Sequence, residues 1–483
     1  MDYGSKYADK RERIIALRLQ KLYREAQKDL LAQIEQFTSK KEKKSKELLK
    51  AIEEGKISEQ EYKEWLAGQA FTEKMWKEKV DDLTETMLHT NEKALAIVRD
   101  EQLNVFSENA NYEAFQIEKD FKGAYSFDIY DESTVNKLVT EKPELLPKRK
   151  VNGRKDKAWN QGIISNCVSQ GIIQGESIDK IAKRIAHDTA SHDMSAMVRY
   201  ARTAMTSAQN SGRMDTMRRA KDMGINVQKE WMATMDRRTR DSHRKLDGQV
   251  RDLDKPFDGE LSKIMYPGDP EADPGEVYNC RCTLVYKYPD YQEFDTDWRQ
   301  NKTIDGDSYL EWKIDKTLAK NGFTFSEVEN IITIEWMRKL PTHQKVGEDG
   351  RKIIPQPLYN KLIKPIEKAG GKVLRGDKET EDHLRSVGAS ASTIDDVLMF
   401  RKDATISDVL EERCHFFQNK QHLNEKKPYN ERECLNEIAA KEYLLVVAEK
   451  YKIPPEETEQ TRKELEFYKE KLERVKKDES SKK

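Results

Sequence analysis

The stretch "VQKEWMATMDRRTRDSH", residues 227–243, decides how the centre of this chain folds. In its first eight residues, side chains such as Trp231 and Ala233 alternate with more polar ones, and this period of two predicts a strand. A second strand is predicted at residues 282–288, "CTLVYKY". If the two strands pair antiparallel, the end of the first lies beside the start of the second.

That pairing would bring the "RDSH" segment close to "NCRC", residues 279–282. Cys280 and Cys282 are two residues apart, so on an extended chain they point to the same face. They could bind one zinc ion, with His243 as a third ligand and Asp241 or water as the fourth. Two alternatives remain open. The cysteines could fill a small core, or act as a redox pair, although a bond between them would be strained.

The segment around His243 is rich in charge of both signs. Because the signs alternate within a few residues, we expect ion pairs that hold the loop rather than contacts with phosphate. The arginines are Arg237, Arg238, Arg240 and Arg244, and the acids are Asp236, Asp241 and Asp247.

Composition and cysteine use bound the class of protein. Of the 483 residues, 36% are charged and 36% are apolar, which is typical of long solvated helices. Five scattered cysteines argue against a secreted disulfide scaffold. No signal core and no transmembrane run is present, so we expect no membrane association and a reducing cytoplasm, or an assembly built there.

Apolar residues at three- and four-residue steps predict long helices. These helices are expected at 11–38, 58–108, 158–171 and 193–222, with Ser58 and Glu61 as a capping box and Ser177 as a cap. The fold class is therefore mainly α, with long N-terminal helices, a small α+β central domain and a mixed α/β C-terminal domain. The expected division is a helical region 1–120, a linker 121–155, the central domain 156–290, a connector 291–345, a C-terminal domain 346–475 and a disordered tail 476–483.

Two basic segments have two interpretations each. Residues 1–50 hold fourteen Lys or Arg against eight Asp or Glu, and the run at 39–46 includes Lys43 and Lys44. It is either a solvated helix or a contact for DNA phosphate or an acidic protein face. The helix 193–222 presents either a solvated or a binding face through Arg199, Arg202, Arg213, Arg218 and Arg219.

The C-terminal domain contains a second set of candidate ligands. If 406–420 is helical, Glu411 and His415 lie four residues apart on one face, and Glu437 on the next helix could join them. The segment resembles a degenerate zinc-peptidase helix, in which Glu411 replaces the first histidine while Glu412 and His415 remain. Glutamate at a ligand position weakens zinc binding. The alternatives are a hydrogen-bonded core, a metal site, and catalysis by Glu412 and His415.

Five ordered motifs in the centre of the chain resemble the Mu F-like family of phage head morphogenesis proteins. They are "ARTAMTSAQNSGR", "KEWMAT", "DRRTRDSHRKLDGQ", "YPGDP" and "NCRC", within residues 155–290.

The resemblance implies a minor head protein of a tailed phage, located in the virion and made in the host cytoplasm. Such a protein acts at the portal vertex in head morphogenesis and in DNA packaging or ejection. The implied partners are the portal protein, capsid or scaffolding proteins, and phage DNA, which would place DNA or portal contacts on the basic segments. The alternatives are a phage-delivered enzyme or toxin with a hydrolase-like C-terminal domain, and a DNA-binding accessory protein. An enzymatic activity is the less favoured expectation, with Glu412 and His415 as its catalytic candidates.

Overall fold

The structure, a computed structural model, describes residues 2–58, 60–61, 73–149, 153–174, 178–289, 306–321, 332, 334–340 and 344–480. The chain divides into two compact units. Unit 1 comprises Met1–Ser126 and Tyr130–Ile304, and unit 2 comprises Phe127–Ile129 and Asp305–Lys483. The described elements are mostly helices, with three small sheets, so the predicted fold class is confirmed.

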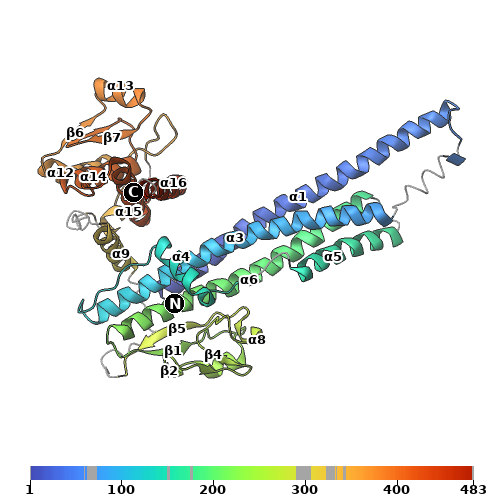
Figure 1. Ribbon diagram of the computed structural model, residues 1–483, viewed down its shortest axis with the longest axis horizontal. Helices are drawn as coiled ribbons and strands as arrows, with labels where there is room; N and C mark the ends of the chain where they lie inside the picture. Colours follow the sequence, from blue (N-terminus) through green and yellow to red (C-terminus); the bar gives the residue numbers. More distant parts are fainter. Residues whose placement is uncertain are drawn as a thin grey trace. The chain divides into compact units, whose positions relative to one another are not determined.

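Long helices that run side by side form most of unit 1 (Figure 1). These helices are α1 (Tyr3–Glu53), α3 (Glu73–Asp120), α5 (Arg154–Ile173) and α6 (Ile178–Asp222). The predicted apolar stripe of α1 is buried between them, with Ile15, Leu19 and Leu30 fully enclosed. The carboxylate of Asp2 accepts a hydrogen bond from the Ser5 N–H and so caps α1.

The helices can be compared with the prediction one by one. The helix expected at 193–222 begins earlier, at Ile178 of α6, because residues 186–193 contain no Gly or Pro to break it. The expected cap Ser177 lies outside the described residues. The Ser58–Glu61 capping box is present, since each side chain bonds the other residue's backbone N–H. The expected linker 121–155 contains α4 (Glu132–Glu141) and the 3₁₀ helix η1 (Pro143–Leu145).

A three-stranded antiparallel sheet in unit 1 confirms the strand pairing. Its order is β2-β1-β5, with Trp231 of β1 opposite Leu284 of β5. The small elements around it are β1 (Gln228–Met232), α7 (Asp241–Leu246), β2 (Val250–Asp252), β3 (Phe257–Asp258), β4 (Lys263–Ile264), α8 (Pro274–Val277) and β5 (Thr283–Lys287). The segment that follows β1 and the segment that precedes β5 therefore lie at the same end of this strand pair.

Unit 2 has its own apolar core and a mixed sheet of order β6-β8-β7. Its strands are β6 (Lys372–Arg375), β7 (Ala391–Ile394) and β8 (Val397–Phe400). Its helices are α9 (Gly306–Lys320), α11 (Ile334–Arg338), α12 (Gln356–Lys368), α13 (Lys378–Ser386), α14 (Ile406–Lys420), α15 (Tyr429–Tyr451) and α16 (Pro455–Ser480). A capping box between Thr405 and Asp408 fixes the start of α14, the helix that carries the second set of candidate ligands.

Candidate metal centre

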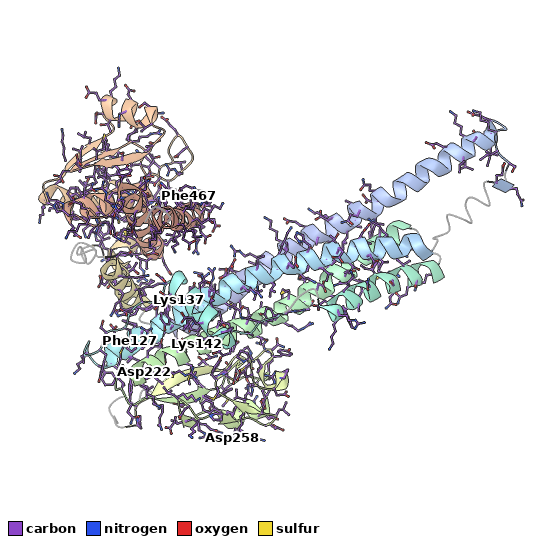
Figure 2. The ribbon with its side chains drawn as sticks, viewed as in Figure 1. Phe127, Lys137, Lys142, Asp222, Asp258 and Phe467 are labelled. Atoms are coloured by element: carbon purple, nitrogen blue, oxygen red, sulfur yellow. The ribbon has the colours of Figure 1, made fainter. Side chains whose placement is uncertain are left out.

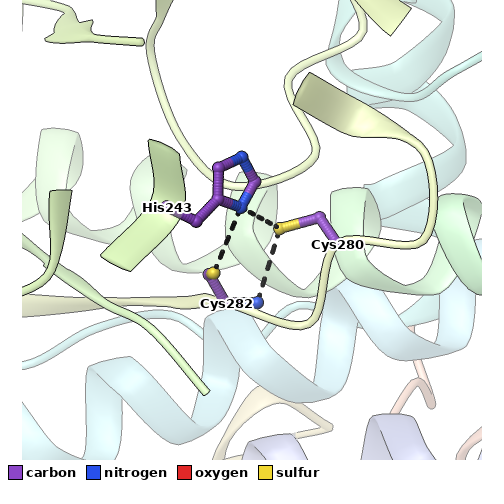
Figure 3. Close-up of side chains that lie close together, drawn as sticks. All are labelled: His243, Cys280 and Cys282. Atoms are coloured by element: carbon purple, nitrogen blue, oxygen red, sulfur yellow. Dashed lines mark hydrogen bonds between the residues drawn. The ribbon is translucent and has the colours of Figure 1, made fainter. Parts of the chain in front are cut away.

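His243, Cys280 and Cys282 come together in the interior of unit 1 (Figure 3). The imidazole Nδ1 of His243 lies 3.6 Å from the Cys280 sulfur and 3.5 Å from the Cys282 sulfur. All three side chains are at most 3% exposed. The structure thus brings together three of the residues predicted as zinc ligands.

The other ring nitrogen of His243 faces a carboxylate, that of Glu276, which the sequence analysis did not select. His243 Nε2 lies 3.0 Å from Glu276 Oε2. Glu276 is buried and accepts further hydrogen bonds from the Ser242 hydroxyl and from the backbone N–H groups of Glu260 and Leu261. Burial opposes ionisation of Glu276, but these bonds and His243 outweigh it and lower its pKa.

The pKa values of the two cysteine thiols shift in opposite directions. The hydrogen bond with Cys280, aided by His243, lowers the pKa of the Cys282 thiol against the effect of burial. The same bond and burial raise the pKa of Cys280.

Asp241, predicted as a carboxylate ligand, is not in the cluster. Its side chain is 94% exposed and pairs with Arg244 at the surface. Asp241 opens the helix α7, whose opposite side carries His243 inward. The loop itself is held by charge pairs as predicted, since Arg238 pairs with Asp236 and Arg244 with Asp241. Arg281, which was not part of the prediction, makes two further bonds to Asp236.

Residues of the motif "ARTAMTSAQNSGR" on α6 bind the backbone around the cysteines. Asn210 accepts a hydrogen bond from the Leu284 N–H and donates to the carbonyl of Cys282. The Thr206 hydroxyl donates to the Cys280 carbonyl. From the other side, the Thr234 hydroxyl of "WMAT" donates to the Arg281 carbonyl. The cysteine loop is therefore fixed from both α6 and β1.

Other motif residues hold the same region in place. Trp231 packs edge-on against the His243 ring, with ring centres 5.3 Å apart. Asp247 of "LDGQ" accepts the Ala233 N–H. Gly268 of "YPGDP" has a φ of +84°, and a Cβ there would collide with the backbone of Ser207. The five motifs thus converge on one structure around His243 and the cysteines.

Arg213, predicted as a contact for DNA or portal, has a structural role instead. It is fully buried, donates two bonds to the carboxylate of Asp2 and one to the Leu284 carbonyl, and so ties α1 and β5 to α6. Its neighbour Gly212 lets α6 approach α3, because a Cβ there would collide with the Phe106 carbonyl. The sequence could not distinguish this arginine from its exposed neighbours.

A cavity of about 820 Å³ lies beside the cluster. Both cysteines line it, together with the predicted contact residues Arg199 and Arg202. Further lining arginines are Arg13, Arg238, Arg240 and Arg281, against the acids Asp2, Asp9 and Glu12. The surroundings of the cavity are therefore basic, although Arg202 pairs with Glu12.

The remaining predicted contact residues lie elsewhere. Arg218 and Arg219 line a smaller cavity of about 380 Å³ with Lys142 and Asp222, both labelled in Figure 2. The Arg219 guanidinium also stacks on the Tyr130 ring, 4.4 Å from its centre. Lys43 and Lys44 are in α1, but their side chains lie outside the described residues.

In unit 2, Glu411, His415 and Glu437 also come together, with ligand atoms within 4.8 Å of one another. His415 Nε2 lies 3.5 Å from Glu437 Oε1, and His415 Nδ1 is bonded to Gln418. All three ligand candidates are half-buried. The predicted juxtaposition on α14 and α15 is therefore present.

A lysine already neutralises part of this second cluster. Lys441 donates to Glu411 and lies 2.8 Å from Glu464. Burial disfavours the Lys441 ammonium, but the two carboxylates outweigh burial and raise its pKa. Burial raises the pKa of Glu412 to about 7. This arrangement matches the hydrogen-bonded core that the sequence left open, with a lysine that the sequence did not indicate.

Comparison with known proteins identifies the class of the central region. Residues 162–285 match the family described as Phage Mu protein F like protein. This stretch of the chain is a Mu F-like domain, so the resemblance seen in the sequence is confirmed.

Two curated relatives match. The chain is 33% identical over 129 residues to minor head protein GP7 of Bacillus phage SPP1, covering 26% of this chain and 39% of the relative. It is 29% identical over 172 residues to NAD(+)–arginine ADP-ribosyltransferase EFV of Enterococcus faecalis, covering 35% of this chain and 34% of the relative. The chain thus matches less than half the length of either relative. No solved structure matches.

Among the described residues, every helix is too short or too polar to cross a membrane.

Proposed function

We propose that this protein is a minor component of a tailed-phage head that acts at the portal vertex during head morphogenesis and DNA packaging or ejection. One observation carries the proposal: the domain matching the Mu F-like family is also the part of unit 1 in which all five motifs converge. The similarity to the SPP1 minor head protein supports the same assignment. Portal, capsid or scaffolding proteins and phage DNA are the proposed partners.

The architecture of unit 1 suits a structural role. Its helix α1 has 51 residues, and at 1.5 Å per residue it extends for about 75 Å. Buried polar links such as Arg213–Asp2 tie this helix to the Mu F-like domain, so a contact made along the helix can position that domain.

The test is the composition of the particle. Virions of the phage that encodes the chain should contain it at a low copy number relative to the major capsid protein. Partial disassembly of the heads should release it together with the portal. If quantitative mass spectrometry of purified virions finds none, the protein is not a head component. If it is found but remains with the capsid shell when the portal is removed, the portal assignment is wrong.

DNA contact is a second candidate, favoured by the arginine-lined cavity of unit 1. Its test is duplex binding between low and physiological salt, since each phosphate contact steepens the salt dependence by about one unit of slope. Charge removal by Arg199→Ala and Arg13→Ala should flatten the slope, whereas Lys221→Ala, outside this cavity, should not. Binding that does not change with salt would eliminate this candidate.

A hydrolytic activity in unit 2 is the third candidate, favoured by the convergence of Glu411, His415 and Glu437. In this reading the two glutamates and His415 hold a metal, and Glu412 acts as general base. The position of Lys441 argues against a metal at this site, because a metal must compete with the ammonium for Glu411. A His415→Ala chain that folds, binds as much metal as the wild type and supports infection equally well would eliminate the activity.

A further inference from the structure

We propose that His243, Cys280 and Cys282 bind one zinc ion, which fixes the cysteine loop to helix α7 inside the Mu F-like domain. The fourth ligand is a water molecule from the adjoining cavity. This inference goes beyond the proposed function, because it holds whether or not the protein acts in a phage head.

The spacing of the three ligand atoms fits tetrahedral zinc. With Zn–S bonds of about 2.3 Å and Zn–N bonds of about 2.1 Å, a tetrahedral centre separates sulfur from nitrogen by about 3.6 Å. The structure places His243 Nδ1 3.6 Å from the Cys280 sulfur and 3.5 Å from the Cys282 sulfur. Both sulfurs are equally distant from one nitrogen, whereas a hydrogen bond would join that nitrogen to only one of them.

The His243 ring is held in an orientation that suits a metal ligand. Buried Glu276 lies 3.0 Å from Nε2, so this nitrogen can donate to the carboxylate, and Nδ1 faces the two sulfurs. Metal-bound histidines characteristically donate their second nitrogen to a carboxylate in this way. Three further donors hold Glu276 itself, so the ring is oriented without the metal.

The arginines nearest the two sulfurs donate hydrogen bonds to other groups. Arg240 donates to the Tyr278 carbonyl, and Arg281 makes two bonds to Asp236. The backbone N–H of Cys282 donates to the Cys280 sulfur at 3.4 Å, which fixes the position of this sulfur. Zinc would neutralise both thiolates, and soft sulfur ligands with one imidazole select zinc over magnesium or calcium.

The competing explanations are less consistent with these contacts. A disulfide between residues two apart is strained, and both thiols are free in the structure. Simple packing accounts for the buried sulfurs but not for the aligned Glu276–His243 pair. The three side chains supply three ligands, and because both cysteines line the cavity, solvent can provide the fourth.

The experiment measures zinc in the full chain, purified without a metal-binding tag, by elemental analysis and native mass spectrometry. We expect one zinc per chain. Cys280→Ser, Cys282→Ser and His243→Gln should each weaken zinc binding by more than about 100-fold. Cys167→Ser removes a buried cysteine outside the cluster, and His415→Ala disrupts the cluster in unit 2. Both variants should keep the zinc.

A second measurement uses only wild-type protein, so the proposal can be tested even if the variants do not fold. Wild-type protein stripped by a chelator and reloaded with Co²⁺ should show a thiolate-to-cobalt charge-transfer band. The proposal is overturned if the folded wild type holds no zinc and shows no such band. It is also overturned if zinc survives in Cys280→Ser but is lost in His415→Ala.

Discussion

The two clusters of candidate ligands differ in the group that neutralises their negatively charged side chains. In unit 1, two buried sulfurs and His243 face one another, and the nearby arginines bind other groups. In unit 2, Glu411 receives a hydrogen bond from the Lys441 ammonium, so the chain provides its own cation. Proximity of ligand-type residues is therefore a weak criterion for a metal site.

The surroundings of each histidine separate the two clusters further. Glu276 is buried and fixes the His243 ring through one nitrogen, leaving the other for a metal. His415 is half-buried, and its two nitrogens face Gln418 and Glu437. The first arrangement orients a lone pair toward two thiolates, whereas the second satisfies the imidazole with partners already in the fold.

The largest expected effect is that of metal removal on unit 1. A ligand present at about 1,000 times its dissociation constant stabilises the native state by about 4 kcal/mol. Chelation of the wild type should therefore speed hydrogen exchange by about 1,000-fold in peptides covering 228–287 and leave 406–451 unchanged. Cys280→Ser protein should not respond to the chelator. Equal responses in both units would remove the contrast between the clusters.

Loss of the Lys441 ammonium should destabilise unit 2 almost as much as zinc removal destabilises unit 1. Lys441→Met leaves Glu411 and Glu464 without their cation, which we expect to cost about 3 kcal/mol at neutral pH. The cost should shrink at acid pH as the carboxylates are protonated. The free energy of unfolding from denaturant titration measures it, with exposed Lys463→Met as the control. A variant as stable as the wild type would show that Lys441 is not the neutralising group.

The carboxylate that contacts His243 gives a smaller effect. Glu276→Gln keeps the size of the side chain but removes its charge, and we expect zinc affinity to fall 10- to 100-fold, or about 1.4–2.7 kcal/mol. Competition with a chromogenic chelator measures the affinity, and exposed Glu260→Gln is the matched control. If Glu276→Gln binds zinc as tightly as the wild type, the carboxylate does not act through the histidine.

The smallest effect is a pH dependence in unit 2. Burial raises the pKa of Glu412 to about 7 in the folded chain, above its ordinary value of 4.5. The folded state then holds a proton that the unfolded state has lost, so stability falls as pH rises from about 4.5 to 7. Glu412→Gln should flatten this dependence. We expect a change of roughly 1 kcal/mol, less than the full shift would give, because the side chain is only half-buried and solvent screens it. Denaturant titrations from pH 4.5 to 8 test it against exposed Glu449→Gln, which should keep the wild-type slope.

Local patterns in the sequence predicted part of the site. The period of two at 227–234 gave the strand β1, its pairing with β5 followed from turn and strand signals, and the spacing of Cys280 and Cys282 placed both beside His243. The pairing alone could not identify Glu276. Its approach depends on how the loop from β4 to β5 folds back, and no periodicity encodes that path.

The charged residues were the hardest to assign. Arg202 and Arg213 lie eleven residues apart on one helix, and no sequence pattern distinguishes them. Arg213 is buried, whereas Arg202 lines a cavity. Which face of α6 is enclosed depends on α1 and α3, which are distant in the chain. Lys441 was missed for the same reason, because its partners are on α14 and α16.

Zinc-edge X-ray absorption on the full chain tests the central claim most directly, because it reports which atoms surround the metal. The account predicts two sulfur scatterers at about 2.3 Å and nitrogen or oxygen scatterers at about 2.0–2.1 Å. A shell of oxygen and nitrogen alone would place the zinc with Glu411 and His415, or at the surface, and would contradict the account.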